Sequence, residues 1–515
     1  MTGAGHYYVT TPIYYVNDVP HIGHAYTTLA CDVLARFMRL DGCNVRFLTG
    51  TDEHGQKVEK AAAAAGMDPQ AFTDRMSQNF RSLCSVMNFS NDDFIRTTEA
   101  RHIASTQAIW KAIAEAGHIY LGAYEGWYAV RDEAFYAESE LVDGPDGRKL
   151  APTGAEVEWV KEPSYFFRLS AWQDRLLDFY AQNPDFIAPE SRRNEVSSFV
   201  RGGLRDLSIS RTTFKWGVPV PGDPQHIMYV WLDALTNYVT AVGYPDTDDP
   251  AFRTFWPADL HMVGKDILRF HAVYWPAFLM AAGLEPPRRV FAHGWWTNEG
   301  QKISKSLGNA IDPLTLVDRY GLDPVRYFLL REVPFGNDGD FSRKAMVQRL
   351  NSDLANSLGN LGQRVLSMIG KNCEGRVPAA GPATAEDKAL LDGAAALLPA
   401  VRAAIRSQSF HSALIAIWDI VGEANRYVDS QAPWALRKTD RARMDAVLYV
   451  LAETIRRLGF IIQPFMPESA SRLLDQLAIP GDSRNFSAFE KALAAGTALP
   501  APQPVFPRFA DDAEA

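Results

Sequence analysis

The 515-residue chain carries a formal net charge of −9, with 47% hydrophobic and 22% charged residues. This composition is ordinary for a folded globular protein and excludes a strongly basic nucleic-acid coat, although a local basic face that binds RNA is compatible with it. The length suffices for about three domains. The four cysteines form no CxxC pair, so we expect reduced thiols and a cytoplasmic location. We find neither a signal peptide nor the ~20 apolar residues of a membrane span.

The first part of the chain alternates between predicted strands and helices. Apolar, β-rich runs at 6–15 and 44–49 are each followed by a segment with helical periodicity, after His24 and at 56–65. This alternation is typical of an α/β fold with a parallel sheet, in which ligands lie beyond the carboxyl ends of the strands. Asp52 follows the second run, where it can hold an ammonium group or cap the next helix.

The sequence His21-Ile22-Gly23-His24 separates the first strand from the first helix. A helix N-terminus presents unpaired N–H groups and a partial positive charge, which suits a phosphate. Two imidazoles three residues apart can face one bound group, and Gly23 lets the backbone approach it. The motif by itself leaves three interpretations open, namely a nucleotide site, structural histidines and a metal site. The further ligands of such a metal site would be Asp52, Glu53 and His54.

The middle of the chain has shorter and less regular elements. Segment 116–225 carries hairpin-like signals around Gly144 and Gly154, which favours an α+β insertion into the sheet. We expect the sheet to resume at 227–234 and again near 261–266. After that second strand, three side chains four residues apart would line one helix face. They are Ile267, His271 and Trp275.

A second phosphate-binding candidate stands far downstream, at Lys302-Ile303-Ser304-Lys305-Ser306. Its two lysines lie three apart on a loop flanked by glycines. They are mobile point charges suited to the β- and γ-phosphates of a nucleotide and to the charge that develops on a leaving pyrophosphate. Taken alone, such a loop is also compatible with ordinary solvated surface.

The last third of the chain is predicted to be helical. An apolar stripe with steps of four and three runs from Leu350 to Ile369, and another runs from Met444 to Leu458. Together they predict a helical bundle. Asn356, Asn360 and Arg364 form a polar stripe on the first of these helices.

His21–His24 and Lys302–Ser306 together resemble the HIGH and KMSKS signatures of the class I aminoacyl-tRNA synthetases, and the chain is most similar to their methionyl branch. The first signature is identical, and the second departs only in Ile303, where methionine is usual. The resemblance implies a Rossmann-like parallel-sheet catalytic domain split by an α+β connective insertion, followed by an α-helical bundle that binds the anticodon. The implied boundaries are 1–115 and 226–292 for the catalytic halves, 116–225 for the insertion, 293–345 for the KMSKS loop and stem-contact connector, and 346–515 for the helical domain with a C-terminal return.

The resemblance also implies the reaction. Such an enzyme activates L-methionine with ATP and Mg²⁺ and transfers the methionyl group to initiator and elongator tRNA(Met). The implied catalytic residues are His21, His24, Lys302 and Lys305. The implied ATP-binding residues are His21, Gly23, His24, Lys302, Ser304 and Lys305. The implied methionine-binding residues are Ile13, Tyr15, Asp52, Trp231, Ala234, Tyr238, Ile267, His271 and Trp275.

Asn356, Asn360, Arg364 and Trp434 match the anticodon-recognition positions of the same branch. The insertion of this branch commonly carries zinc-binding cysteine knuckles, but Ala129 and Asp132 stand here where cysteines would be expected. We therefore expect no structural zinc. The chain lacks the oligonucleotide-binding extension that dimerises some relatives, so we expect a monomer.

Three alternatives compete with this interpretation. A cysteinyl enzyme of the same class would require cysteine ligands for a pocket zinc, which this chain lacks. A non-catalytic RNA-binding relative would be free to lose its active-site lysines, whereas both signatures are present. A metallohydrolase would use His21, His24 and His54 as metal ligands.

Overall fold

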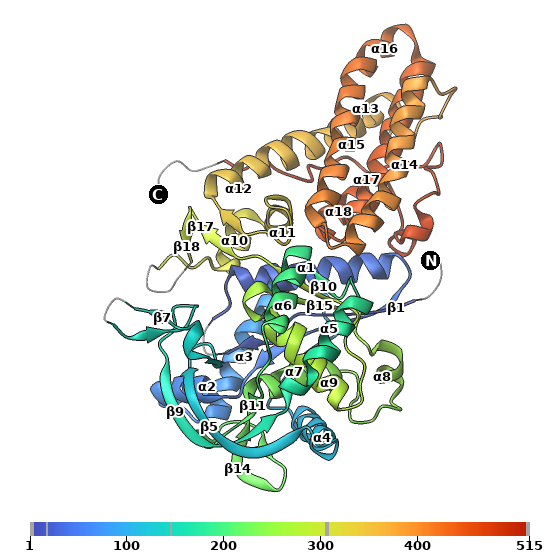
Figure 1. Cartoon of the computed structure of the whole chain (residues 1–515). Helices are drawn as coiled ribbons and strands as arrows, with labels where there is room; N and C mark the ends of the chain where they lie inside the picture. Colours follow the sequence, from blue (N-terminus) through green and yellow to red (C-terminus); the bar gives the residue numbers. More distant parts are fainter. Residues whose placement is uncertain (1–4, 17–18, 145–146, 304–307, 511–515) are drawn as a thin grey trace. The chain divides into compact units, whose positions relative to one another are not determined.

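The structure is a computed structural model that describes residues 5–16, 19–144, 147–303 and 308–510. It divides into two compact units (Figure 1). The sheet unit comprises His6–Pro20 and Arg46–His293, and the helical unit comprises Met1–Gly5, His21–Val45 and Gly294–Ala515. Of the helices in the described residues, none is long and apolar enough to cross a membrane.

The sheet unit is built on a seven-stranded sheet with the order β10-β16-β15-β1-β3-β2, in which β4 also pairs with β3. The pairs β1–β15, β15–β16, β10–β16, β2–β3 and β3–β4 are all parallel. This is the Rossmann-like sheet expected from the sequence. Its strands are β1 (His6–Thr10), β2 (Tyr14–Tyr15), β3 (Asn44–Asp52), β4 (Asp93–Arg96), β10 (Ile187–Ala188), β15 (Leu260–Gly264) and β16 (Val290–His293).

In the sheet unit, large apolar side chains are buried in one continuous core by the helices α4 (Ala100–Glu115), α7 (Val230–Thr240), α8 (Pro250–Phe255) and α9 (Trp275–Ala281). The helices α2 (Gln56–Ala64) and α3 (Pro69–Val86) contribute to a second, smaller cluster with Tyr14, Val16 and Phe94. The prediction of a strand at 227–234 is wrong, because most of that run belongs to α7. Every residue of α7 is buried, and a short apolar run buried on all sides has no periodicity that distinguishes strand from helix.

The insertion forms mainly antiparallel sheets. A four-stranded sheet has the order β11-β9-β5-β6, and its long antiparallel pair of β5 and β9 curves across the lower part of Figure 1. β7 and β8 form the hairpin expected around Gly144. The elements of this region are β5 (Ile119–Ala129), β6 (Ala134–Tyr136), β7 (Val142–Asp143), β8 (Lys149–Leu150), β9 (Glu158–Phe167), α5 (Gln173–Gln182), α6 (Glu190–Arg201), β11 (Leu207–Ser208), β12 (Ser210–Arg211), β13 (Pro219–Val220) and β14 (Asp223–Met228).

The helical unit joins a long N-terminal helix to a small sheet and a bundle, in which α14, α15 and α17 run alongside one another (Figure 1). Its strands are β17 (Trp296–Asn298), β18 (Gln301–Lys302) and β19 (Gly339–Phe341). Its helices are α1 (Ile22–Leu40), α10 (Pro313–Tyr320), α11 (Leu322–Arg331), α12 (Arg343–Arg349), α13 (Asn360–Asn372), α14 (Ala385–Arg406), α15 (Phe410–Gln431), α16 (Pro433–Thr439), α17 (Arg441–Ile462) and α18 (Pro467–Gln476).

The apolar stripe that begins at Leu350 faces the core of this unit as predicted, since all six of its residues are buried. Its first part differs from the expected α-helix, because Leu350–Gly359 is a π-helix that leads directly into α13. The wider turn explains why the first steps of the stripe, from Leu350 to Leu354 and to Leu358, are both four residues.

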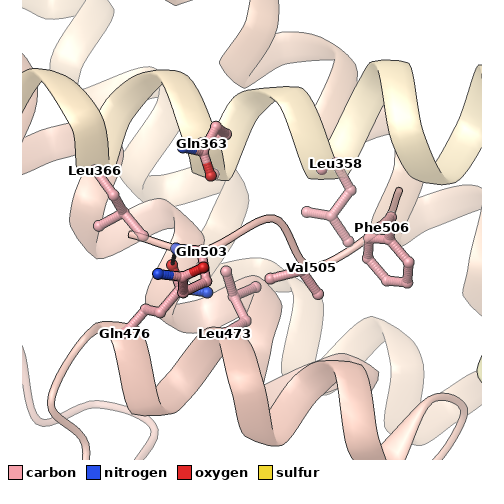
Figure 2. Close-up of a pocket in the computed structure, with 10 residues that line it drawn as sticks. Leu358, Gln363, Leu366, Leu473, Gln476, Gln503, Val505 and Phe506 are labelled. Atoms are coloured by element: carbon pink, nitrogen blue, oxygen red, sulfur yellow. Dashed lines mark hydrogen bonds between the residues drawn. The ribbon is translucent and has the colours of Figure 1, made fainter. Parts of the chain in front are cut away.

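The C-terminal segment returns along this helix. Figure 2 shows Val505 and Phe506 beside Leu358 of the π-helix, with Leu473 and Gln476 of α18 on the other side. The main-chain N–H of Gln503 donates to Oε1 of Gln476 at 2.7 Å. The polar and apolar contacts together fix the C-terminal segment against the helix that bears Asn356, Asn360 and Arg364.

Candidate functional site

His21 and His24 lie at the N-terminus of α1, as predicted. His21 is the N-cap residue, and its Nδ1 accepts a hydrogen bond from the N–H of Gly23 at 3.1 Å. Nδ1 of His24 accepts from the N–H of His21, also at 3.1 Å. Since both Nδ1 atoms are acceptors, each neutral ring carries its proton on Nε2. The pair therefore presents two Nε2–H donors, which suit phosphate oxygens.

The two imidazoles are packed closely, with ring centroids 3.9 Å apart. Burial, and then the neighbouring His21, lowers the pKa of His24 well below its usual value, so this ring stays neutral. A Cβ on residue 23 would lie 2.9 Å from Cε1 of His21. Gly23 is therefore required for the imidazole of His21 to fold back over the helix end.

The helix that carries these histidines is tied to the downstream half of its own unit. The N–H of Ile22 donates to the carbonyl of Ile311 at 3.0 Å, only a few residues after the lysine loop. Deeper in the unit, Nη2 of Arg326 lies 2.6 Å from Oδ2 of Asp32, and both side chains are fully buried. Such a buried pair is costly to break, so α1 is held firmly against the segments that follow the lysine loop.

Lys302 lies on β18, which pairs with β17 through a tight hairpin. The two turn residues, Glu299 and Gly300, both have positive φ, at 49° and 76°, which is the requirement of a type I′ turn. Nδ2 of Asn309 donates to the carbonyl of Lys302 at 3.1 Å and closes the base of the loop. Ser304 and Lys305, the other predicted ATP-binding residues of this loop, lie outside the described residues.

The predicted methionine-binding residues all belong to the sheet unit. Asp52 ends β3, Ile13 follows β1, and Ile267 follows β15. Because these strands share one sheet and their carboxyl ends lie at one edge, the three positions fall on the same side of it. α7 adds Trp231, Ala234 and Tyr238 with steps of three and four, which place them on one helix face.

The aromatic members of this set contact one another. Trp231 packs edge-on to Tyr15 at 6.3 Å and to His271 at 6.1 Å between ring centroids. The best-stacked partner of Trp231 is Phe270, with centroids 3.8 Å apart and planes 8° apart. The sequence did not indicate Phe270, because a regular helix that directs His271 to the site would turn the preceding residue away. Phe270–Tyr274 is instead a π-helix, a feature frequent at functional sites.

The polar groups near these aromatic side chains are hydrogen-bonded to one another. Nδ1 of His271 lies 2.9 Å from the carbonyl of Ile267, so it must donate, and Nε2 then accepts from the Tyr238 hydroxyl at 2.7 Å. Burial lowers the pKa of His271 to about 4. The ring is therefore neutral near pH 7, and this end of the site carries no charge.

His261 of β15 is a second residue that the sequence analysis missed. Its ring stacks on Tyr238 with centroids 4.0 Å apart, and its Nε2 accepts from Trp275 Nε1 at 3.3 Å. Its Nδ1 must then donate to Oγ1 of Thr10, 2.8 Å away. The available signal was a histidine inside an otherwise apolar strand.

Asp52 lies at the opposite end of the set, in register with Tyr15 across the β2–β3 pair. It is only 2% exposed, and its Oδ1 has no hydrogen-bond partner within the described chain. Burial raises the pKa of Asp52 well above its usual value, and the nearby carboxylates of Asp233 and Glu133 raise it further. A desolvated carboxylate with one unpaired oxygen is suited to a cation with N–H donors.

A buried His–Asp–His bridge, also missed, stands beside Asp52. Asp233 accepts from Nδ1 of His54 at 2.6 Å and from Nε2 of His102 at 2.7 Å. Both hydrogen bonds favour the ionised form, and the pKa of Asp233 falls to about 2 although burial opposes this. The bridge connects the turn after β3 with α4 and α7. The hint in the sequence was an acidic residue within an apolar run.

The insertion turn for which no zinc was expected is closed by other contacts. Ala129, Ala151 and Ala155 form a small apolar cluster. Asp132 accepts from the Tyr136 hydroxyl at 3.0 Å and from Thr153. Throughout the described ranges, no three His, Cys, Asp or Glu side chains are arranged to hold a metal ion. This finding gives no support to the metal-site interpretation of His21, His24 and His54.

Two of the four predicted anticodon residues contact each other in the structure. The guanidinium of Arg364 lies 5.6 Å from the ring centroid of Trp434 and pairs with Asp429 at 2.9 Å. Trp434 follows the left-handed residue Ala432 at the start of α16 and is 45% exposed. Asn356 and Asn360 are exposed on the neighbouring helix. A solvent-facing indole beside a cation is unusual for a structural tryptophan.

Comparison with known proteins supports the same family. The model of the tRNA synthetases class I (M) matches residues 7–366. The chain belongs to this family. A second match, at residues 377–515, is to the anticodon binding domain of methionyl tRNA ligase.

Relatives of this family cover nearly the whole chain. The methionine–tRNA ligases of Brucella suis biovar 1 and Mesorhizobium japonicum are each 60% identical, with 98% of both chains covered. The solved structure of Mycobacterium tuberculosis methionyl-tRNA synthetase in complex with methionyl-adenylate is 56% identical, with a TM-score of 0.96 over 98% of this chain and 100% of that one. The apo form of that enzyme has a TM-score of 0.90. The predicted family, enzyme class and α/β fold with a helical C-terminal domain are therefore confirmed.

Proposed function

We propose that this chain activates L-methionine with ATP and then charges tRNA(Met). The methionine carboxylate attacks the α-phosphate, a new acyl–phosphate bond forms, and pyrophosphate leaves. The terminal ribose hydroxyl of the tRNA then takes the methionyl group and AMP leaves. The observation that carries this proposal is the hydrogen bond from Ile22 to Ile311, because it ties the helix end that bears His21 and His24 to the segment a few residues after the lysine loop.

The helical unit supplies the groups for ATP. His21, His24, Lys302 and Lys305 are the proposed catalytic residues, and Gly23 and Ser304 complete the ATP set. The methionine carboxylate is already ionised at pH 7, so the first step requires no protein base. The two neutral imidazoles and the lysine ammonium groups instead stabilise charge on the phosphates as it moves to the leaving pyrophosphate.

ATP binds as its magnesium complex in this proposal. Apart from the hydroxyl of Ser304, the proposed ATP residues offer N–H donors rather than oxygen ligands, so the phosphates and water would supply most of the magnesium coordination. When bound, the ion neutralises part of the phosphate charge. No zinc is included in the proposal.

The sheet unit supplies the methionine site. Asp52 takes the ammonium group, and the aromatic set around Trp231 takes the side chain. Sulfur–ring contacts contribute about 0.3 to 1.5 kcal/mol each, and the neutral state of His271 suits an uncharged thioether. Ile13, Tyr15, Ala234, Tyr238, Ile267 and Trp275 complete the proposed contacts.

An exchange assay tests the substrate. We expect the protein to catalyse methionine-dependent exchange between ATP and radioactive pyrophosphate, with every other standard amino acid far slower at equal concentration. Stronger exchange with any other standard amino acid, cysteine included, would refute the assignment. Charging of total tRNA with methionine then tests the second step.

The boundaries expected for the five segments, a monomeric state and a cytoplasmic location complete the proposal. Size-exclusion chromatography with light scattering tests the monomeric state, since the measured mass of a dimer would be about twice that of the 515-residue chain.

The anticodon of tRNA(Met) is proposed to bind at Trp434, Asn356, Asn360 and Arg364. The indole would stack on an unpaired base, and the polar groups would contact base edges.

Replacing Trp434 with alanine tests the anticodon role. Loss of one base stack, about 1–3 kcal/mol, should raise KM for tRNA roughly 5- to 150-fold. Exchange of ATP with pyrophosphate should not change, because that reaction requires no tRNA. Trp434→Phe keeps an aromatic face and should retain most of the affinity. Equal losses in the exchange and charging assays would instead indicate a folding defect.

A further inference from the structure

Glu133 lies in the turn that joins β5 to β6, where the backbone is strained. Its φ is +48°, in the left-handed region that residues other than glycine rarely adopt. The Tyr229 hydroxyl donates to the carbonyl of Glu133 at 2.9 Å and fixes this part of the turn. The residue is only 1% exposed, so its side chain is buried within the sheet unit. Strain of this kind gathers at functional sites.

The carboxylate of Glu133 is enclosed but has no hydrogen bond of ordinary geometry. Both oxygens are buried and lack such a partner among the residues that the structure describes. Oε1 lies over Gly55, the N-cap of α2, where an added Cβ would come within 2.8 Å of it. The Tyr15 hydroxyl and the main chain of Lys57 lie beside the same carboxylate. Glu133 therefore brings a buried anionic group from the insertion into the proposed methionine site.

Titratable groups from several elements surround this carboxylate. They are Tyr15 of β2, Asp52 of β3, Lys57 of α2, Tyr128 of β5, Arg211 of β12 and Tyr229 before α7. Burial raises the pKa of Glu133 to about 7, while Lys57, the Tyr15 hydroxyl and Arg211 oppose the rise. Glu133 in turn contributes to the raised pKa of Asp52, after burial and Asp233. The carboxylates of Glu133 and Asp52 therefore disfavour each other's ionised state.

We propose that Glu133 is a positioning residue of the amino-acid site, acting through Tyr15, Lys57 and Asp52 on the binding of the substrate ammonium group. Lys57 Nζ lies 4.5 Å from the centre of the Tyr15 ring, and Tyr15 is the cross-strand partner of Asp52. Ionised Glu133 attracts the positive charge of Lys57 and the nearby hydroxyl of Tyr15. An incoming ammonium group adds the positive charge that favours both ionised carboxylates, so its binding releases protons.

This inference rests on the proposed function, since the ammonium group is that of methionine. As the pH falls from 8 to 6, Glu133 becomes protonated, and KM for methionine should rise roughly 3- to 10-fold, which corresponds to a pKa shift of up to about one unit on binding. Glu133→Gln keeps the shape of the side chain without its charge. Its KM should be raised at pH 8 and should vary much less with pH, whereas kcat should change little.

Calorimetry gives a readout that does not depend on catalysis. Titration of methionine in buffers of different ionisation enthalpy counts the protons released on binding. We expect release of roughly half a proton near pH 7 from Glu133 of the unmodified protein, because the group is about half protonated there, and clearly less release from Glu133→Gln. Lys57→Met removes a charge that lowers the pKa of Glu133, so it should shift the KM profile towards higher pH. That variant tests the inference even if Glu133→Gln fails to fold.

Glu162→Gln is the matched control. Glu162 is a buried carboxylate of the same insertion that also lies near Arg211, at 3.7 Å, but it accepts its hydrogen bonds from Thr212. Its pH profile should match that of the unmodified protein. The inference is overturned if Glu133→Gln retains both the KM profile and the proton release, with only Glu133→Ala losing thermal stability. Failure of the unmodified protein to exchange methionine would instead overturn the proposed function.

Discussion

Replacing Asp52 with asparagine is expected to lower kcat/KM for methionine in ATP–pyrophosphate exchange by about 10²- to 10³-fold, since loss of one partner of a buried charge pair typically costs 2–5 kcal/mol. The substituted amide keeps the shape of the carboxylate but cannot neutralise the substrate ammonium. The loss should appear mainly in KM for methionine, and KM for ATP should change little. Exchange kinetics at varied methionine and fixed saturating ATP measure it.

The thermal stability of Asp52→Asn distinguishes a binding role from a structural one. Burial raises the pKa of Asp52, so its ionised form is disfavoured in the fold. The free energy of unfolding therefore falls as the pH rises above the carboxyl group's unfolded pKa and towards its raised folded pKa. The substitution removes this penalty, and the Tm of the variant at pH 8 should equal or exceed that of the unmodified protein. A lowered Tm together with an unchanged KM would contradict the assigned role.

Asp323 provides the matched control for removal of a buried carboxylate. It is 3% exposed in the helical unit, and burial also raises the pKa of its carboxyl group. Its Oδ2 accepts from the N–H of Ser469 at 2.5 Å, a bond that asparagine can retain. Asp323→Asn should leave KM for methionine unchanged.

Replacing Lys302 with alanine is expected to lower kcat of the exchange reaction by about 10²- to 10³-fold, the usual effect of removing one preorganised group that stabilises charge in the transition state. The ammonium group is proposed to act on the phosphates, so KM for methionine should stay within about twofold. The same expectation holds for Lys305. Pre-steady-state formation of methionyl-adenylate measures the step directly.

Lys344→Ala controls for the loss of a positive charge from the helical unit. Lys344 is exposed on α12 and has no proposed role. Its adenylation rate should match that of the unmodified protein. A parallel loss in Lys302→Ala and Lys344→Ala would indicate a general electrostatic effect, and equal rates for Lys302→Ala and the unmodified protein would exclude the assigned role.

Local sequence predicted the parts of the fold whose signals are local. The helix after His24, the hairpin around Gly144 and the apolar stripe from Leu350 all appear where their spacing placed them. The run at 227–234 was misassigned, because complete burial of α7 erases the amphipathic pattern. The π-helix at His271 was also missed, since a step of four residues fits both helix types approximately.

The sequence by itself determined the family and the candidate chemistry, because the two signatures consist of particular residue types at fixed local spacing. Only the tertiary structure decided which states those residues adopt. The neutral ring of His271, the unpaired oxygen of Asp52 and the enclosed carboxylate of Glu133 all depend on neighbours far away in the chain. Desolvation and charge–charge interactions follow distances in space, and no local pattern of residues encodes those distances.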